Sequence, residues 1–136
     1  MLGKDHAAYA CIIDDEDSSE TDSGALSIKF IPGLGPLFSP EETRSYSGYK
    51  AYKLGNGMQA TIVGDGAEVY FQCELKDRQR PLSVTGNIDS GFYMSFEARF
   101  QPLFRSSLKV ARSLGCENDI NFPNPTKMKP LPLRKG

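Results

Sequence analysis

The stretch AEVYFQCEL (residues 67–75) decides the fold class, because its side chains alternate strictly between apolar and polar. Successive side chains of a β-strand point to opposite faces, so this period of two places all the apolar residues on one face. That face carries Ala67, Val69, Phe71, Cys73 and Leu75. The stretch therefore predicts an antiparallel strand with one face in a core and the other toward solvent.

The segments before this strand extend it into a meander. YKAYKL (residues 49–54) and MQATIV (58–63) are separated by GNG, and Asn56-Gly57 suits the positive φ angles of a type I′ hairpin turn. GDG (64–66) supplies the next turn. Further strands are predicted in PLSVTG (81–86) and in ALSIKFI (25–31), which alternates Leu26, Ile28 and Phe30.

Residues 92–104 fit two structures. Alternation from Phe92 to Ala98 indicates a fifth meander strand, whereas Phe96, Phe100 and Phe104 recur at helical spacing. Pro102 in a helix interior costs about 3 kcal/mol, but near a first turn it costs little. We therefore predict a strand to about Ala98 and an amphipathic helix over residues 101–114, ended by Gly115 in the left-handed conformation.

The chain of 136 residues suits one domain of the α+β class. We expect an antiparallel sheet of about five strands in a meander, with one C-terminal amphipathic helix packed on one face. The predicted boundaries are an acidic N-terminal segment (1–24), a single α+β domain (25–122) and a Pro-rich basic tail (123–136). Beyond Phe122 we expect the tail to be extended and weakly ordered.

Charge and hydropathy exclude some partners. The net charge of −1 and the pI of about 5.8 are untypical of a nucleic-acid-binding protein. The chain contains no apolar run near the roughly 18 residues that span a bilayer. Its start also lacks the basic end and apolar core of a signal peptide. Two readings remain open: a cytosolic protein, or the soluble part of a longer precursor.

No motif indicates a metal, a cofactor or catalysis. The three cysteines, at positions 11, 73 and 116, form no C-x-x-C pair, and the acidic run lacks the Gly of a calcium loop. The glycine-rich turns lie between strands, whereas a dinucleotide loop precedes a helix. His6 is the single histidine, so no Cys–His pair or triad can be assigned. We therefore expect a protein that is not an enzyme.

Two groups of residues are candidates for binding: a tyrosine cluster for a protein partner, and a basic helix face for anionic lipid or an acidic partner. Tyr46, Tyr49 and Tyr52 lie close together in the sequence, and Tyr is enriched in interfaces. The alternative is that they pack within the strand and its preceding loop. Arg105, Lys109 and Arg112 share one helix face opposite Leu103, Phe104, Leu108, Ala111 and Leu114. The alternative for the basic face is an ordinary solvated helix surface.

Two of the cysteines are predicted to lie near each other. Cys73 points into the core, and Cys116 follows the helix that must cover the same sheet. A disulfide between them would contribute about 3–4 kcal/mol to the free energy of unfolding. The alternative is two buried free thiols, since free Cys often packs as a small apolar residue. Cys11 is left over, either free or paired elsewhere.

The second half of the chain resembles small soluble domains of uncharacterised membrane-anchored proteins of Gram-positive bacteria. The resemblance covers residues 67–125 and rests on EVYFQCEL, RPLSVTG, SLKVARSLGCEN and FPNP. It implies an extracytoplasmic location, an N-terminal membrane segment that this chain does not contain, and a Cys73–Cys116 bridge. It carries over no catalytic residue, because none is defined for such domains.

These observations predict a non-catalytic binding or accessory domain of the cell envelope. The alternative is a cytosolic protein-interaction, immunity or viral accessory protein, whose acidic N-terminal run would contact a basic partner. An enzyme without a local motif is the third reading.

Overall fold

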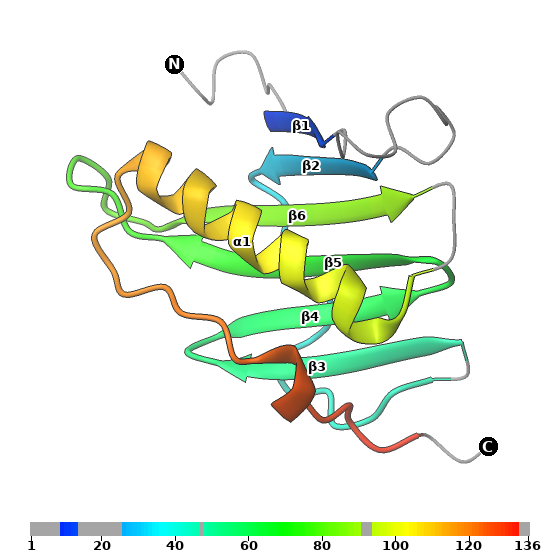
Figure 1. Cartoon of the computed structure of the whole chain (residues 1–136). Helices are drawn as coiled ribbons and strands as arrows, with labels where there is room; N and C mark the ends of the chain where they lie inside the picture. Colours follow the sequence, from blue (N-terminus) through cyan, green and yellow to red (C-terminus); the bar gives the residue numbers. More distant parts are fainter. Residues whose placement is uncertain (1–8, 14–25, 47, 91–93, 134–136) are drawn as a thin grey trace.

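The computed structural model describes residues 9–13, 26–46, 48–90 and 94–133. Its architecture is α+β, as predicted: an antiparallel sheet carries a long helix on one face (Figure 1). The sheet has six strands, against about five expected, in the order β1-β2-β6-β5-β4-β3. The elements are β1 (Tyr9–Ile13), β2 (Leu26–Pro32), β3 (Tyr49–Gly55), β4 (Met58–Val63), β5 (Gly66–Cys73), β6 (Leu82–Ser90), α1 (Phe96–Leu114) and the 3-10 helix η2 (Pro125–Lys127).

Four consecutive strands, β3 to β6, form the predicted meander. The β3–β4 turn has positive φ at Asn56 (54°) and Gly57 (78°), as the Asn-Gly sequence indicated. Strand β2 pairs with β6 instead of β3, so the residues that connect β2 to β3 must cross the sheet. They cross on the face away from α1, where the Gln59 side chain exchanges hydrogen bonds of 3.1 and 2.9 Å with the backbone of Phe38 (Figure 1).

The sixth strand, β1, falls within the segment that we assigned to an acidic N-terminal region. It pairs with β2 in an antiparallel register from Tyr9 opposite Phe30 to Ile13 opposite Leu26. The acidic run itself and the rest of residues 1–24 lie outside the described part of the chain.

The core lies between the sheet and α1. The apolar face of β5 behaves as predicted, since Ala67, Val69, Phe71 and Cys73 are all buried. The other face was predicted to lie toward solvent, but Tyr70 on it is 4% exposed, because the connection from β2 to β3 crosses that face. From the helix, Phe100 and Leu103 are fully buried against the apolar face of β5, and Phe104 and Ala111 nearly so. The core is therefore a single layer of apolar side chains under the helix.

The helix begins at Phe96, so the predicted strand to Ala98 and the helix start near Gln101 are wrong. Ser95 caps the helix by accepting a hydrogen bond from the Ala98 amide, and Pro102 lies inside it. The reason is aromatic packing. Phe96, Phe100 and Phe104 lie one turn apart with ring centroids separated by 5.1 Å at each step; the first pair meets edge-to-face and the second is stacked. Burying these rings stabilises the helix by about 1.5–3 kcal/mol each, which exceeds the cost of one interior proline.

The helix ends as predicted. Gly115 has φ 79°, and its amide donates to the carbonyl groups of Ala111 and Arg112. The left-handed conformation turns the chain back toward β5, so that Cys116 meets the sheet.

The C-terminal segment packs on the domain up to residue 133, in place of the weakly ordered tail that we expected. Pro125 is buried, and the Leu131 amide donates to the Ala51 carbonyl of β3 over 2.8 Å. The Ser45 hydroxyl accepts from the Ala51 amide and donates to the Leu131 carbonyl. The segment thus covers part of the outer edge of β3, which would otherwise expose unpaired backbone groups.

Candidate functional site

Cys73 and Cys116 are joined in a disulfide in the structure, with Cα atoms 4.9 Å apart. Backbone contacts beside the bond hold the same two segments together. The Glu117 amide donates to the Glu74 carbonyl over 2.7 Å, and the Asn118 side chain bonds both the Glu74 amide and the Gln72 carbonyl. The bridge thus anchors the end of α1 to the end of β5. Its place at a packed junction indicates a structural function.

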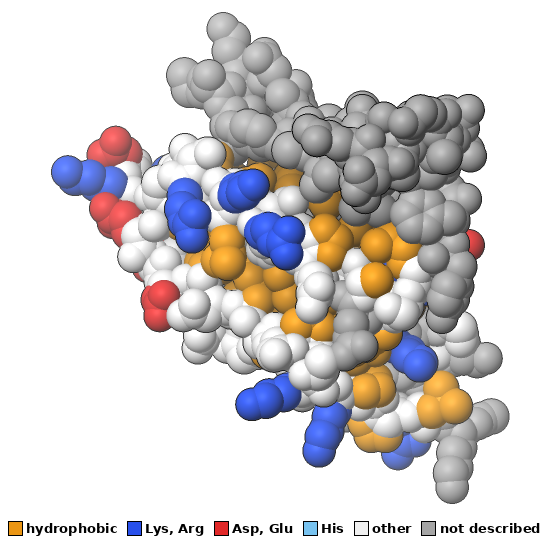
Figure 2. Space-filling view, in the orientation of Figure 1, with side chains coloured by type: hydrophobic (Ala, Val, Ile, Leu, Met, Phe, Trp, Pro, Cys, Tyr) orange, Lys and Arg blue, Asp and Glu red, His pale blue; other side chains and the backbone are white. Residues whose placement is uncertain are grey.

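The basic helix residues Arg105, Lys109 and Arg112 are exposed on the outer surface of α1, as the periodicity predicted. Figure 2 shows Lys and Arg side chains over the helix and again near the C-terminal segment. None of the three lines the groove of about 770 Å³ that is described below. They form a solvated charged face.

The three predicted tyrosines divide between the two faces of β3. Tyr46 and Tyr49 lie near each other, with ring centroids 6.1 Å apart. Tyr52 is three positions after Tyr49, so it points to the opposite face and packs under the helix with 2% of its surface exposed. All three nevertheless line one groove, because that groove wraps the outer edge of β3.

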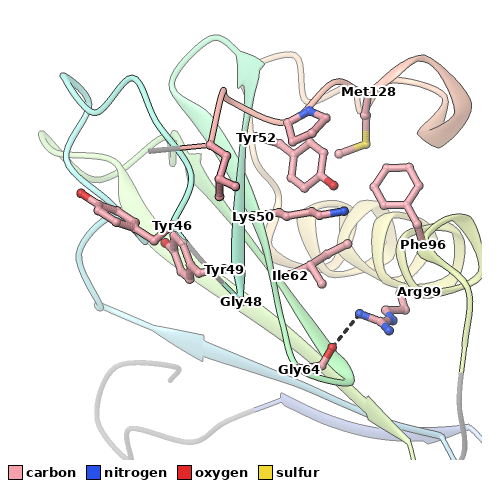
Figure 3. A pocket seen from close by; sticks show the side chains of 12 residues that line it. Tyr46, Gly48, Tyr49, Lys50, Tyr52, Ile62, Gly64, Phe96, Arg99 and Met128 are labelled. Atoms are coloured by element: carbon pink, nitrogen blue, oxygen red, sulfur yellow. Dashed lines mark hydrogen bonds between the residues drawn. The ribbon is translucent and has the colours of Figure 1, made fainter. Parts of the chain in front are cut away.

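This groove, which we call the β3-edge groove, has a volume of about 770 Å³. Four separate parts of the chain form it: β3, the end of β4, the first turn of α1 and the C-terminal segment (Figure 3). Its residues on the helix side are Lys50, Tyr52, Ile62, Phe96, Arg99 and Met128, and those toward the other side include Tyr46 and Tyr49.

The helix side of the groove has an aromatic floor. The rings of Tyr52 and Phe96 stack with centroids 5.4 Å apart, and Phe100 meets Tyr52 edge-on at 5.6 Å. Ile62 lies directly opposite Lys50 in the β3–β4 pairing, and Met128 approaches from the C-terminal segment (Figure 3). This half of the groove therefore offers apolar contact surface.

Three polar groups meet this apolar surface. The Arg99 side chain is 7% exposed, and its Nη1 and Nε donate to the carbonyl groups of Gly64 and Met94 at 2.9 and 3.0 Å. Lys50 extends its ammonium group into the groove between Tyr52 and Arg99 (Figure 3). Burial raises the pKa of Tyr52, although the nearby Arg99 charge acts in the opposite direction. Tyr52 therefore presents a neutral hydroxyl at neutral pH.

The other end of the groove is acidic. The Tyr46 hydroxyl donates to the Glu42 carboxylate. Burial raises the pKa of Tyr49, and the negative charges of Glu68 and Glu42 raise it further. The two ends of the groove therefore differ in charge, with cations on the helix side and carboxylates near the Tyr46–Tyr49 pair.

Sequence reasoning identified only the tyrosines of this groove. Phe96, Arg99 and Met128 were missed because they come from segments that are distant in the sequence from the tyrosines, and Lys50, next to Tyr49, was missed as well. One signal was available: Lys50 and Tyr52 share a face of β3 by their spacing of two. The contribution of the helix start was hidden by the wrong boundary at Gln101.

A second hollow of about 440 Å³ lies on the opposite face, lined by residues that include Lys53, Gln59, Tyr70 and Gln72. Three of its four polar side chains, those of Gln59, Tyr70 and Gln72, already bond groups of this chain. Gln59 bonds Phe38, the Gln72 amide donates to the Tyr70 hydroxyl, and that hydroxyl also contacts Ser83. The β3-edge groove is therefore the better candidate site.

Within the described residues, no group of three or more His, Cys, Asp or Glu side chains is arranged to hold a metal ion. In the same part of the chain, no helix is long and apolar enough to cross a membrane.

Comparison with known proteins found no relative: no family model, no curated protein and no solved structure matches this chain. The resemblance to extracytoplasmic domains therefore stays an expectation, and the function must be argued from the site itself.

Proposed function

We propose that this protein is a non-catalytic binding domain whose ligand occupies the β3-edge groove. The observation that carries the proposal is the half-buried ring of Phe96, which stacks on Tyr52 in the groove beside Lys50 and Arg99. Ligand sites combine apolar walls with a few convergent polar groups in clefts of about 300–1,000 Å³, and this groove has both features.

The chemistry of the lining supports binding over catalysis. Among the described residues that line the groove, the titratable side chains are phenols and two cations. They include no carboxylate, imidazole or thiol that would serve as a general base or nucleophile near neutral pH.

We further propose that the domain works outside the cytoplasm, at the cell envelope. The Cys73–Cys116 pairing supports this location, because structural disulfides persist in oxidising compartments and are rare in the cytosol. Intact-mass analysis with and without reductant tests this part on protein from its native compartment. Three free thiols would refute the envelope location and favour the cytosolic interaction protein.

Site-specific photo-crosslinking tests the groove. A photoreactive phenylalanine analogue replaces Leu133, which lines the groove and is 62% exposed, in cells that produce the protein. The control carries the same group at Lys109 on the outer face of α1. A discrete adduct at position 133 that is absent at position 109 is expected. Equal labelling at both positions, or none at either, would contradict a ligand in the groove.

A further inference from the structure

We propose that the β3-edge groove binds an acidic peptide segment of a partner protein, with a carboxylate held beside an apolar side chain. This inference rests on the proposed function and specifies its ligand. The carboxylate would bind at Lys50 and the Tyr52 hydroxyl, near the fixed charge of Arg99, and the apolar side chain would pack on Phe96 and Met128.

The Tyr52 hydroxyl is the first argument. Most of Tyr52 is buried, with 2% of its surface exposed, and it lines the groove. Within the described part of the chain its hydroxyl has no hydrogen-bond partner, and it is not a buried unpaired atom, so it reaches the surface of the groove. A carboxylate oxygen from a ligand would accept this hydrogen bond.

The charges beside the hydroxyl are the second argument. Lys50 has no ion-pair partner among the described residues, and its ammonium lies next to Tyr52 (Figure 3). The Arg99 guanidinium is held in place by two backbone carbonyl groups, so its charge is fixed in the wall of the groove. Two cations around one neutral donor form a complement to a carboxylate.

The apolar surface next to these charges requires a ligand with two parts. Phe96 is half-buried on top of Tyr52, and Ile62 and Met128 complete the wall (Figure 3). An isolated inorganic anion would leave this surface uncovered. A ligand with an aromatic or branched side chain adjacent to its carboxylate would cover it and gain from removing apolar area from water.

The distribution of charge along the groove favours a peptide and sets its direction. Lys127 and Lys129 flank Met128 on the C-terminal segment and extend the positive charge beyond the pocket itself. Glu42 and Glu68 lie near the Tyr46–Tyr49 end and would repel an acidic group there. An extended segment with its acidic residue toward Lys50 matches both ends, and the volume of about 770 Å³ accommodates a few residues.

Three probe peptides test the ligand class, each titrated into the ¹⁵N-labelled full chain and followed by NMR. The first is acetyl-Gly-Phe-Glu-Leu-Gly-amide. The second replaces Glu by Gln, and the third replaces Phe and Leu by Ala. Only the first is expected to bind well, with each control weaker by about tenfold, since a hydrogen bond to a charged group and a buried ring each contribute that much.

Protein variants assign the effect to named atoms. Lys50→Gln removes one charge and Tyr52→Phe removes only the hydroxyl, and each should weaken the Glu peptide by about tenfold while leaving the Gln peptide unchanged. Lys109→Gln removes the same charge from the outer face of α1 and should change neither. Phenylacetate serves as a small carboxylate and should bind at least tenfold more weakly than the Glu peptide.

The outcomes separate this inference from the proposed function. Equal binding of the Glu and Gln peptides, or unchanged binding by Lys50→Gln, would refute the acidic preference while photo-crosslinking at position 133 still supports a ligand in the groove. Binding of phenylacetate as tight as that of the peptide would refute the peptide in favour of a small molecule. Failure of all three peptides would overturn the inference.

Discussion

The ring of Phe30 lies over Gly86, so closely that a Cβ atom at position 86 would be 2.6 Å from Cε1 of that ring. Gly86 is opposite Phe30 on β2 and opposite Val69 on β5, and both neighbours are fully buried. The missing side chain therefore makes room for the largest residue that β2 places in the core.

Gly86→Ala should destabilise the fold by about 1–3 kcal/mol, because the added methyl group overpacks a rigid aromatic ring. Chemical denaturation measures the loss. Gly35→Ala is the matched control, since a Cβ atom at Gly35 meets nothing within 4 Å, and it should change stability little. Equal effects of the two substitutions would show that Phe30 does not occupy this position.

Removing the disulfide by the double substitution Cys73→Ala and Cys116→Ala should lower the free energy of unfolding by about 3–4 kcal/mol. The bond closes a loop between residues 43 apart in the sequence, so its loss raises the conformational entropy of the unfolded chain. Reductant should destabilise the wild-type protein by a similar amount and leave the double variant unaffected. A wild-type unfolding midpoint that does not respond to reductant would contradict a bridge.

Ser45→Ala should cost about 1–3 kcal/mol, because it leaves the buried Ala51 amide and the Leu131 carbonyl without their shared partner. Hydrogen exchange should also become faster in residues 128–133, which this serine fastens to β3. Ser113→Ala, at an exposed position of α1, is the control and should leave both measurements unchanged. Unaltered exchange in the C-terminal segment would refute its docking through Ser45.

Tyr52 should make the fold less stable at high pH. Its folded-state pKa is raised above the ordinary value of 10.0 by burial, so the folded state binds the phenolic proton more tightly than the unfolded chain does. The resulting stability is complete below pH 10 and is lost as the pH rises toward the folded pKa. Denaturation curves between about pH 8 and pH 11 should show this fall, and Tyr52→Phe should reduce its slope. An identical slope in the variant would contradict the burial of the phenol.

The helix start shows why local patterns were insufficient. The sequence around Pro102 is compatible with a strand or a helix, and the local cost of an interior proline favoured the strand. Contacts with Tyr52 and Phe122, which are distant in the sequence, reversed that balance, because the packed rings of Phe96, Phe100 and Phe104 gain more from burial than one proline costs.

The sequence alone determined the features that depend on neighbouring residues: the alternating strand at residues 67–75, the Asn56-Gly57 turn, the helix end at Gly115 and the α+β class. Each follows from the spacing of apolar residues along the chain or from a positive φ angle, which few residues other than Gly and Asn adopt. Only the tertiary structure decided the crossing of the connection from β2 to β3, the docking of the C-terminal segment on β3 and the β3-edge groove. These join residues far apart in the chain, and the free energy that selects such contacts comes from burial and hydrogen bonding between segments, which no local pattern records.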